Sequence, residues 1–294
     1  MPEISEGILS FVFSDFFVSF TLSMLTLNLA LITHGADGLR RVEEMNLPHV
    51  ENVRYVVSWQ MHENNEVPAS LAARSDIEIH RLDTPGLSLN RNNAIDHCSA
   101  DIILFADNDV VYSAEGLKNV IASFEADNSL DMALFKASYP EEKPYPDTDT
   151  TLSLPFPKGY YVSSIEIAFR PERIKDLRCC PALGLGASEM TAGEDDFFVI
   201  SAIRRGLNVG FVNKEICSHP QDSTGDRVDA GIMMASGFII RTIYSHSFFP
   251  RLFLKALRIK RAGKASFLPT LFSLWKGAAK TNRLLPKIES KYRW

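Results

Sequence analysis

Cysteine is scarce in this sequence of 294 residues, which contains only Cys98, Cys179, Cys180 and Cys217. Their spacing does not match that of a zinc site, and the adjacent pair is poorly placed to form an ordinary disulfide. These features argue against a zinc-binding module and against a secreted domain held by disulfides. A reduced compartment, the cytoplasm, is the simpler expectation.

Acidic residues are almost absent from the C-terminal part of the chain. Residues 241–294 contain 13 Lys and Arg and a single acid, Glu289, whereas the residues before them contain 18 basic and 35 acidic side chains. The acidic body argues against a nucleic-acid partner. Apolar and basic residues at helical spacing in Phe248–Arg258 and Phe267–Lys280 predict two basic amphipathic helices. These helices could pack on the domain with solvated lysines, or they could lie on an anionic membrane.

The N-terminus lacks the features of a secretory signal. Phe16–Thr33 is uncharged and mostly apolar, but it has no basic flank and no evident small-residue cleavage site. A transmembrane anchor here would consume the strand expected at Leu27–Thr33. We therefore expect a hydrophobic extension at residues 1–23, a folded domain at 24–225 and a helical, basic region at 226–294.

Short apolar runs alternate with amphipathic stretches through the body of the chain. This order predicts a nucleotide-binding α/β half-domain at its start. Tyr139–Tyr161 contains five prolines and is expected to be a loop. The expected strands are Leu27–Thr33, Asn52–Trp59, Ile77–Arg81, Ile102–Ala106, Met132–Ser138, Ser163–Arg170 and Val209–Asn213. The expected helices are one that ends near Met45 and those at Val67–Arg74, Leu89–Cys98, Ala114–Asp127 and Asp196–Arg205.

Two carboxylates one residue apart follow the apolar run Ile102–Ala106. A buried parallel strand delivers Asp107 and Asp109 to the carboxyl edge of the sheet, where open α/β folds bind ligands. Two acids there repel each other unless a cation neutralises them, and hard divalent cations bind carboxylate and phosphate oxygens together. The pattern predicts a metal site for a phosphorylated ligand, although Asp and Asn are also common in a plain turn after a strand.

Three other interpretations of Asp107-Asn108-Asp109 are weaker. An EF-hand calcium loop needs a glycine at its sixth position, where this chain has Val111 and Tyr112. A phosphatase of the haloacid dehalogenase kind needs its second acidic cluster at the end of another apolar strand, but a loop precedes Glu194. A sugar nucleotidyltransferase needs a glycine-rich phosphate loop after its first strand, and residues 34–38 match one poorly.

A second acidic motif, Glu194-Asp195-Asp196, stands at an expected helix start. Acids favour the first turn of a helix because they offset the macrodipole and bind free N–H groups. Three in a row behind a glycine-rich loop also repel one another. This repulsion indicates that at least one of them is kept for chemistry, such as general-base catalysis.

Three further polar residues have an ordinary explanation beside a functional one. Arg91 and Asn92 lie at an expected helix start, where they could hold a phosphate or merely sit on a solvated turn. His219 follows a strand and is more often a surface or core histidine than a ligand. It gains significance if the fold places it beside Asp109.

Three blocks of the sequence, taken together, resemble the inverting glycosyltransferases of family 2. They are Gly86–Ile95, Asp107-Asn108-Asp109 and Gly193-Glu194-Asp195, and their order and spacing match the family over about Leu27 to Gly225. The resemblance implies an α/β fold of the GT-A class, a Rossmann-like mixed sheet flanked by helices, here followed by C-terminal basic amphipathic helices. It implies a metal-dependent hexosyl- or N-acetylhexosaminyltransferase. The implied reaction moves a sugar from a nucleotide-sugar donor, expected to be a UDP-sugar, to a glycan or lipid-linked acceptor in surface polysaccharide assembly.

The resemblance also implies roles for single residues. Asp195 would be the catalytic base, and Glu194 would orient the acceptor hydroxyl. The sequence departs from the family at Ser58-Trp59-Gln60, where many members have acids that read the base of the nucleotide, so the nucleotide stays open. The implied ligands of a divalent metal, Mn²⁺ or Mg²⁺, are Asp109, Asp107 and His219. The implied donor contacts are Thr33, Ser58, Arg91, Asn92, Asp107 and Asn108.

The alternative interpretation is a catalytically silent glycan-binding or scaffold protein on the same fold. The intact acids of both motifs argue against it, because a silent protein has no need to retain them. The expected location is the cytoplasm, where the basic end could make peripheral contact with the cytoplasmic face of the inner membrane.

Overall fold

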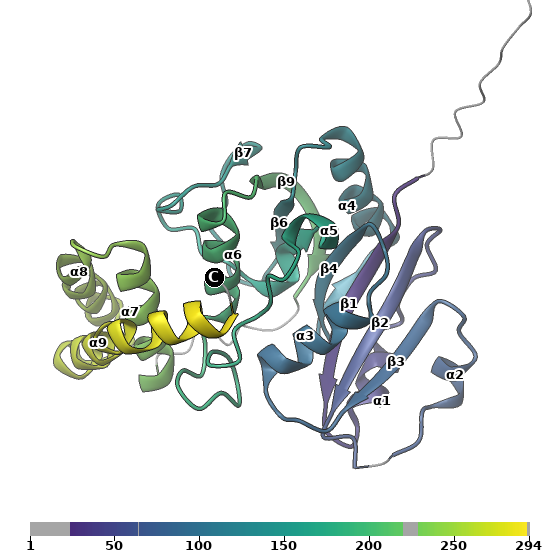
Figure 1. Cartoon of the computed structure of the whole chain (residues 1–294), viewed down its shortest axis with the longest axis horizontal. Helices are drawn as coiled ribbons and strands as arrows, with labels where there is room; N and C mark the ends of the chain where they lie inside the picture. The colour runs from purple at the N-terminus through teal and green to yellow at the C-terminus, as the bar shows by residue number, and fades with distance from the viewer. Residues whose placement is uncertain (1–23, 64, 220–228, 293–294) are drawn as a thin grey trace, which may run out of the picture.

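A mixed nine-stranded sheet forms the centre of the chain in the computed structural model, which describes residues 24–63, 65–219 and 229–292 (Figure 1). The extension expected at residues 1–23 lies outside the described residues. Helices cover both faces of the sheet, and three further helices extend the molecule to one side. The expected α/β fold is confirmed.

The strand order explains where the ends of the strands meet. It is β3-β2-β1-β4-β8-β6-β9-β5, and β7 pairs with β9. Strands β1 to β4 are parallel, β8 is antiparallel to β4 and β6, and β9 is parallel to β6. Because β8 runs the opposite way, its first residues lie at the same edge as the last residues of β4 and β6. The strands are β1 (Leu27–His34), β2 (Val53–Gln60), β3 (Ile77–Leu82), β4 (Ile102–Asp107), β5 (Val111–Tyr112), β6 (Met132–Ser138), β7 (Thr150–Thr151), β8 (Ile167–Phe169) and β9 (Val209–Ser218).

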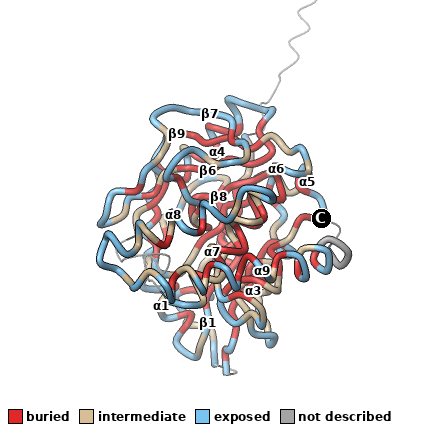
Figure 2. The backbone as a smooth tube through the Cα atoms, turned by 90° about the vertical axis from the view of Figure 1, so that its left-hand side faces the viewer, coloured by how far each residue is buried: buried red, intermediate tan, exposed pale blue. Residues whose placement is uncertain are grey.

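Two apolar cores fill the space between the sheet and its helices. Alternate residues of β4 enter different cores, Leu104 one and Phe105 the other, because successive side chains of a strand point to opposite faces. One core also receives α1 (Gly38–Glu44), α2 (Ala69–Ala72) and α4 (Ala114–Ala126). The other receives α3 (Leu87–His97), α5 (Pro171–Ile174) and α6 (Glu194–Arg204). Figure 2 shows the buried stretches running through the middle of the molecule and the exposed ones along its outer loops and helices.

The C-terminal helices α7 (Ala230–Ile243), α8 (Phe248–Arg261) and α9 (Phe267–Tyr292) form an adjoining layer (Figure 1). Helices α7 and α9 touch backbone to backbone at Gly237 and Gly277, where an added Cβ would lie 1.8 Å from Leu274 O and 1.7 Å from Met234 O. The two basic helices predicted here are confirmed, and α7 was not predicted separately. Nothing in the described part of the chain is both long and apolar enough as a helix to span a bilayer.

Two predicted elements differ from the structure. The strand expected at Ser163–Arg170 was wrong in its first half, which is a 3-10 turn, η1 (Ser164–Glu166), followed by β8. The turn forms because Ser164 and Glu166 direct their side chains to polar partners instead of to a neighbouring strand. Strand β9 continues to Ser218 rather than ending near Asn213, with an irregular register against β6 beyond Leu134. The domain boundary expected at residues 225–226 falls outside the described residues.

Candidate active site

The carboxyl edge of the sheet carries the acid pair that follows β4. Ile102–Ala106 is buried, Asp107 is half-buried and Asp109 is exposed, since the chain turns away from the sheet after Asp107. The backbone of β4 stays paired with β1 while both carboxylates leave the core. The structure thus places this motif at the edge where α/β folds bind their ligands.

One buried arginine of α3 connects this motif to the acids of α6. The Arg91 side chain is 3% exposed. Its Nη1 donates to Asp195 Oδ1 at 2.6 Å and to Glu194 Oε1 at 3.1 Å, and its Nη2 lies 3.5 Å from Asp107 Oδ1. Three distant stretches of the chain therefore share one ion network. The protein's own carboxylates surround the charge of Arg91, so its predicted contact with the donor stays a prediction.

The glycine-rich loop before α6 allows a close approach to the first acid of the motif. Gly184 has a φ of 97°, and a Cβ added there would lie 3.2 Å from Glu194 Cδ. Gly193 precedes the helix with a φ of 88°, in the left-handed region that favours glycine. Both glycines let the backbone turn tightly around Glu194, whose side chain is 8% exposed.

The second and third acids of α6 are held differently. Asp195 accepts from Arg91 through Oδ1 and from the Ser164 N–H through Oδ2 at 3.2 Å. Burial raises the pKa of Asp195 well above its ordinary value, Glu194 adds to the shift, and Arg91 opposes it. Burial also raises the pKa of Asp196, to about 6. A carboxylate with a raised pKa is a stronger base once ionised, which suits proton abstraction from a hydroxyl.

The predicted metal ligands are brought together in part. His219 Nε2 lies 3.7 Å from Asp109 Oδ1, and the His219 ring stacks on Tyr139 with 5.9 Å between ring centroids. Burial and the charge of Asp107 raise the pKa of Asp109, and His219 opposes that shift. Asp107 faces Arg91 and η1 instead. Within the described ranges, no three His, Cys, Asp or Glu side chains are grouped closely enough to hold an ion by themselves.

The remaining predicted donor contacts take part in the internal hydrogen bonds of the fold. Asn108 Nδ2 donates to Thr33 Oγ1 at 2.6 Å, which links the turn after β4 to the end of β1. The Ser58 hydroxyl, on β2, accepts from an asparagine amide of α3 at 2.7 Å. Asn92 exchanges two hydrogen bonds, each of 2.8 Å, with the backbone of Cys179. Thr33 and Asn108 thus lie beside the acid motif, whereas the amide of Asn92 fastens a loop. Their roles in donor binding stay predictions.

Sequence reasoning missed several residues that complete the site. Ser164 Oγ donates to Asp107 Oδ2 at 3.1 Å while its N–H reaches Asp195, so one residue contacts both acid motifs. Tyr139 supports His219, and Lys143 and Glu166 form a buried ion pair behind it. The run Ser163-Ser164 was the available signal, because two polar residues are unusual in a strand expected to be buried.

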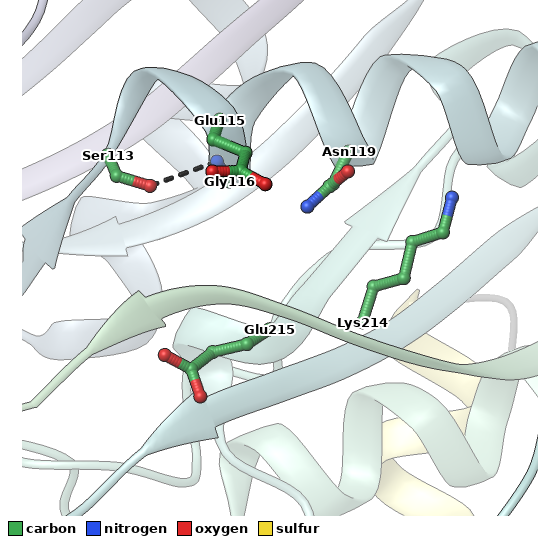
Figure 3. A pocket seen from close by; sticks show the side chains of 6 residues that line it. All are labelled: Ser113, Glu115, Gly116, Asn119, Lys214 and Glu215. Atoms are coloured by element: carbon green, nitrogen blue, oxygen red, sulfur yellow. Dashed lines mark hydrogen bonds between the residues drawn. The ribbon is translucent and has the colours of Figure 1, made fainter.

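A pocket of about 320 Å³ lies elsewhere, between the first turns of α4 and strand β9 (Figure 3). Figure 3 shows Glu115, Asn119, Lys214 and Glu215 around it, with Ser113 Oγ bonded to the Gly116 N–H as a helix cap. None of the predicted site residues lines this pocket. The pocket is therefore separate from the acid motifs at the sheet edge.

Comparison with known proteins agrees with this fold. Residues 66–179 match the sequence model of glycosyl transferase family 2, a segment that contains the Gly86–Ile95 block and Asp107-Asn108-Asp109. No curated protein matches the chain in a sequence search.

Similar solved structures include those of TarS residues 1–349 from S. aureus. The structure of this TarS fragment has a TM-score of 0.54 at 15% identity, with 92% of this chain and 91% of that chain covered. Its complex with UDP gives 0.53 at 16% identity over 92% and 91%. Its complex with UDP-GlcNAc gives 0.52 at 15% identity over 92% of each chain. These likenesses show the fold. The chain therefore has the GT-A fold of these structures, and its residues 66–179 are similar to glycosyl transferase family 2.

Proposed function

We propose that this enzyme transfers a hexosyl or N-acetylhexosaminyl group from a UDP-sugar, with inversion and with a divalent metal, to a glycan or lipid-linked acceptor in surface polysaccharide assembly. The observation that carries the proposal is the network of Arg91, which joins the acid of β4 to both acids of α6. The complexes of TarS with UDP and UDP-GlcNAc support a UDP-sugar donor.

In the proposed reaction, Asp195 takes the proton of the acceptor hydroxyl. The hydroxyl oxygen then attacks the anomeric carbon while the nucleoside diphosphate leaves from the opposite side, so the configuration inverts. Ser164 and Arg91 fix both oxygens of Asp195, which limits the rotation of the carboxylate before attack. Glu194, beside it on the same arginine, would orient the acceptor.

The residues near Asp109 fit a divalent cation that also binds the donor. Asp109 and His219 offer an oxygen and a nitrogen ligand. Burial and the nearby charge of Asp107 raise the pKa of Asp109, and a bound cation would oppose both effects. A site with few protein ligands would suit Mn²⁺ or Mg²⁺, because these cations also bind the oxygens of diphosphate and water. When bound, the metal supplies Lewis-acid stabilisation of the leaving diphosphate.

A donor screen tests the proposal on the full chain. We expect UDP to raise the melting temperature in the presence of Mn²⁺ or Mg²⁺ and to have a much smaller effect with EDTA, because a ligand that binds the folded state stabilises it. We also expect one UDP-sugar to be hydrolysed slowly without an acceptor. GDP and CDP serve as matched controls. The absence of any metal-linked UDP effect would contradict the proposal.

The proposed lipid-linked acceptor agrees with the outer surface of the C-terminal helices. Leu268, Phe272 and Trp275 of α9 are 73%, 55% and 49% exposed and stand at i, i+4 and i+7, on one face of the helix. The face that contains Gly277 is packed on α7. On α8, Phe249 and Phe253 are 54% and 44% exposed. Residues 241–288 contain basic side chains and no acidic one. Apolar and basic residues in this combination are typical of helices that lie on an anionic bilayer.

Vesicle binding tests this peripheral contact. We expect the protein to sediment with vesicles that contain phosphatidylglycerol and not with pure phosphatidylcholine, and salt should weaken the binding. Leu268→Ser/Phe272→Ser/Trp275→Ser should weaken binding by at least about tenfold, since three apolar side chains no longer enter the bilayer. Met61→Ser/Val111→Ser, which alters exposed apolar residues outside α8 and α9, is the control. A triple variant that binds vesicles normally but loses a dimer in ultracentrifugation would assign the surface to a second copy instead.

A further inference from the structure

A buried ion pair behind the site takes no part in the proposed chemistry. Lys143, in the proline-rich segment after β6, places Nζ at 2.6 Å from Glu166 Oε1 and 2.8 Å from Oε2. The two side chains are 1% and 0% exposed. Burial lowers the pKa of Lys143 and raises that of Glu166, while each charge opposes the shift of the other. A pair so costly to bury needs further contacts to hold it.

Four tyrosines of the same segment supply those contacts. Tyr139 and Tyr145 donate their hydroxyls to Glu166 Oε1 at 3.0 and 2.6 Å. The Lys143 ammonium lies 4.3–5.6 Å from the ring centroids of Tyr139, Tyr145, Tyr160 and Tyr161, within the range of cation–π attraction. We call these four residues, with Lys143 and Glu166, the lysine–tyrosine cluster. It ties a segment with little regular structure to η1.

The cluster contacts both halves of the site. Glu166 ends the same one-turn helix, η1, that begins at Ser164, whose hydroxyl and N–H bind the two acid motifs. On the other side, Tyr139 bonds Glu166 and stacks on His219, the partner of Asp109. A shift of Glu166 would therefore move both Ser164, which contacts the proposed base, and Tyr139, which stacks on His219 of the proposed metal site.

We propose that Lys143 is a positioning residue, which acts through Glu166 to hold η1 and Tyr139 in the places that the reaction needs. The proposal rests on the proposed function and deepens it. Lys143 touches no reacting group, so its effect must appear as a loss of alignment. Misplacing a reacting group by a fraction of an ångström to one ångström slows catalysis strongly while leaving substrate binding largely intact.

The test compares the turnover of each variant with that of the wild type. Turnover is divided by the number of molecules that bind UDP, which a UDP titration measures. Lys143→Met keeps the length of the side chain and removes its charge, and we expect kcat to fall by about tenfold to 100-fold with little change in the KM for the donor. Tyr145→Phe loses the bond to Glu166 and the contacts of the same hydroxyl with the Ala137 backbone. It should give a smaller fall, and it keeps the test open if Lys143→Met folds poorly. Tyr160→Phe is the matched control, because it keeps its ring beside Lys143 and loses a hydroxyl that has no hydrogen-bond partner in the described structure.

Unchanged kcat per binding-competent molecule in both Lys143→Met and Tyr145→Phe would overturn the inference and leave a purely structural role. Hydrogen–deuterium exchange separates this outcome from a failure of the proposed function. Peptides that cover residues 139–170 should exchange faster in Lys143→Met than in the wild type, whether or not any sugar is transferred. Equal exchange would overturn the inference even if the enzyme proves to be the proposed transferase.

Discussion

Asp195→Asn is expected to slow sugar transfer by about 100-fold or more while UDP and metal bind nearly as in the wild type, the scale of a lost general base. The amide oxygen can still accept from Arg91 Nη1, so the variant keeps the contact with Arg91 and loses the negative charge. The bond from the Ser164 N–H is lost, because the amide nitrogen cannot accept it. Single-turnover kinetics with saturating donor would measure the effect on the chemical step.

Asp196→Asn is the internal control for the base. We expect nearly normal turnover, because Arg91 and Ser164 donate to the adjacent Asp195 and, among the described residues, neither of them donates to Asp196. Asp196 lies in the first turn of α6, whose N-cap, Gly193, makes no side-chain cap. A dead Asp196→Asn beside an active Asp195→Asn would show that the base is one residue further on. Normal transfer in both variants would place the base elsewhere.

The two variants should also differ in their pH dependence. Because the pKa of Asp195 is raised, the wild-type kcat/KM should fall as pH falls through that raised value, and Asp195→Asn should lose this limb of the profile.

Asp196 has its pKa raised from 3.8 to about 6, so its ionisation destabilises the folded state. As pH rises from about 4 to about 6, the free energy of unfolding of the wild type should therefore fall relative to that of Asp196→Asn, by about 1 to 3 kcal/mol.

Asp109→Ala is expected to abolish metal-linked UDP binding and to leave the fold intact. The Asp109 side chain is 47% exposed, so its loss removes a ligand without opening the core. The variant also removes a carboxylate whose pKa is raised by burial and by the charge of Asp107. Calorimetric titration with UDP in Mn²⁺ or EDTA would measure the difference. The wild type should bind UDP more tightly in Mn²⁺, and the variant should bind it equally weakly in both.

Asp127→Ala is the matched control for this experiment, because Asp127 is an exposed aspartate beyond the end of α4, before the start of β6. It should retain metal-linked UDP binding. His219→Ala should weaken the metal effect and not the weak binding in EDTA, since it removes the imidazole beside Asp109. Metal-linked affinity that survives in Asp109→Ala would show that the cation is held by other groups.

Local sequence pattern predicted most of the sheet correctly. The buried runs at β1, β2, β4 and β6 are visible because a strand covered on both faces needs consecutive apolar residues. The pattern failed at η1, where Ser164 and Glu166 interrupt an otherwise apolar run. It also missed the two-residue strands β5 and β7, which are too short to show any period.

The site was predicted as two separate acid motifs and a histidine whose significance depended on its distance from Asp109, and the structure places His219 Nε2 3.7 Å from Asp109 Oδ1. Its role as a metal ligand stays a prediction. The partners of those acids could not be predicted. Arg91 was expected to face the donor, yet it contacts three carboxylates of the protein. Ser164 carried no motif at all. Such contacts depend on which strands are neighbours, and a single sequence gives no direct signal for that.

By itself, the sequence determined the α/β class, the acid motifs at a strand end and a helix start, and the basic apolar helices at the C-terminus. Each of these follows from short-range periodicity, charge and turn chemistry, which act within a few residues. Only the tertiary structure decided that β8 runs antiparallel between β4 and β6. That direction brings η1 to the carboxyl edge, where Ser164 meets both Asp107 and Asp195. The physical reason is that strand order and direction are set by how whole faces of the sheet bury apolar surface, and no local pattern encodes this.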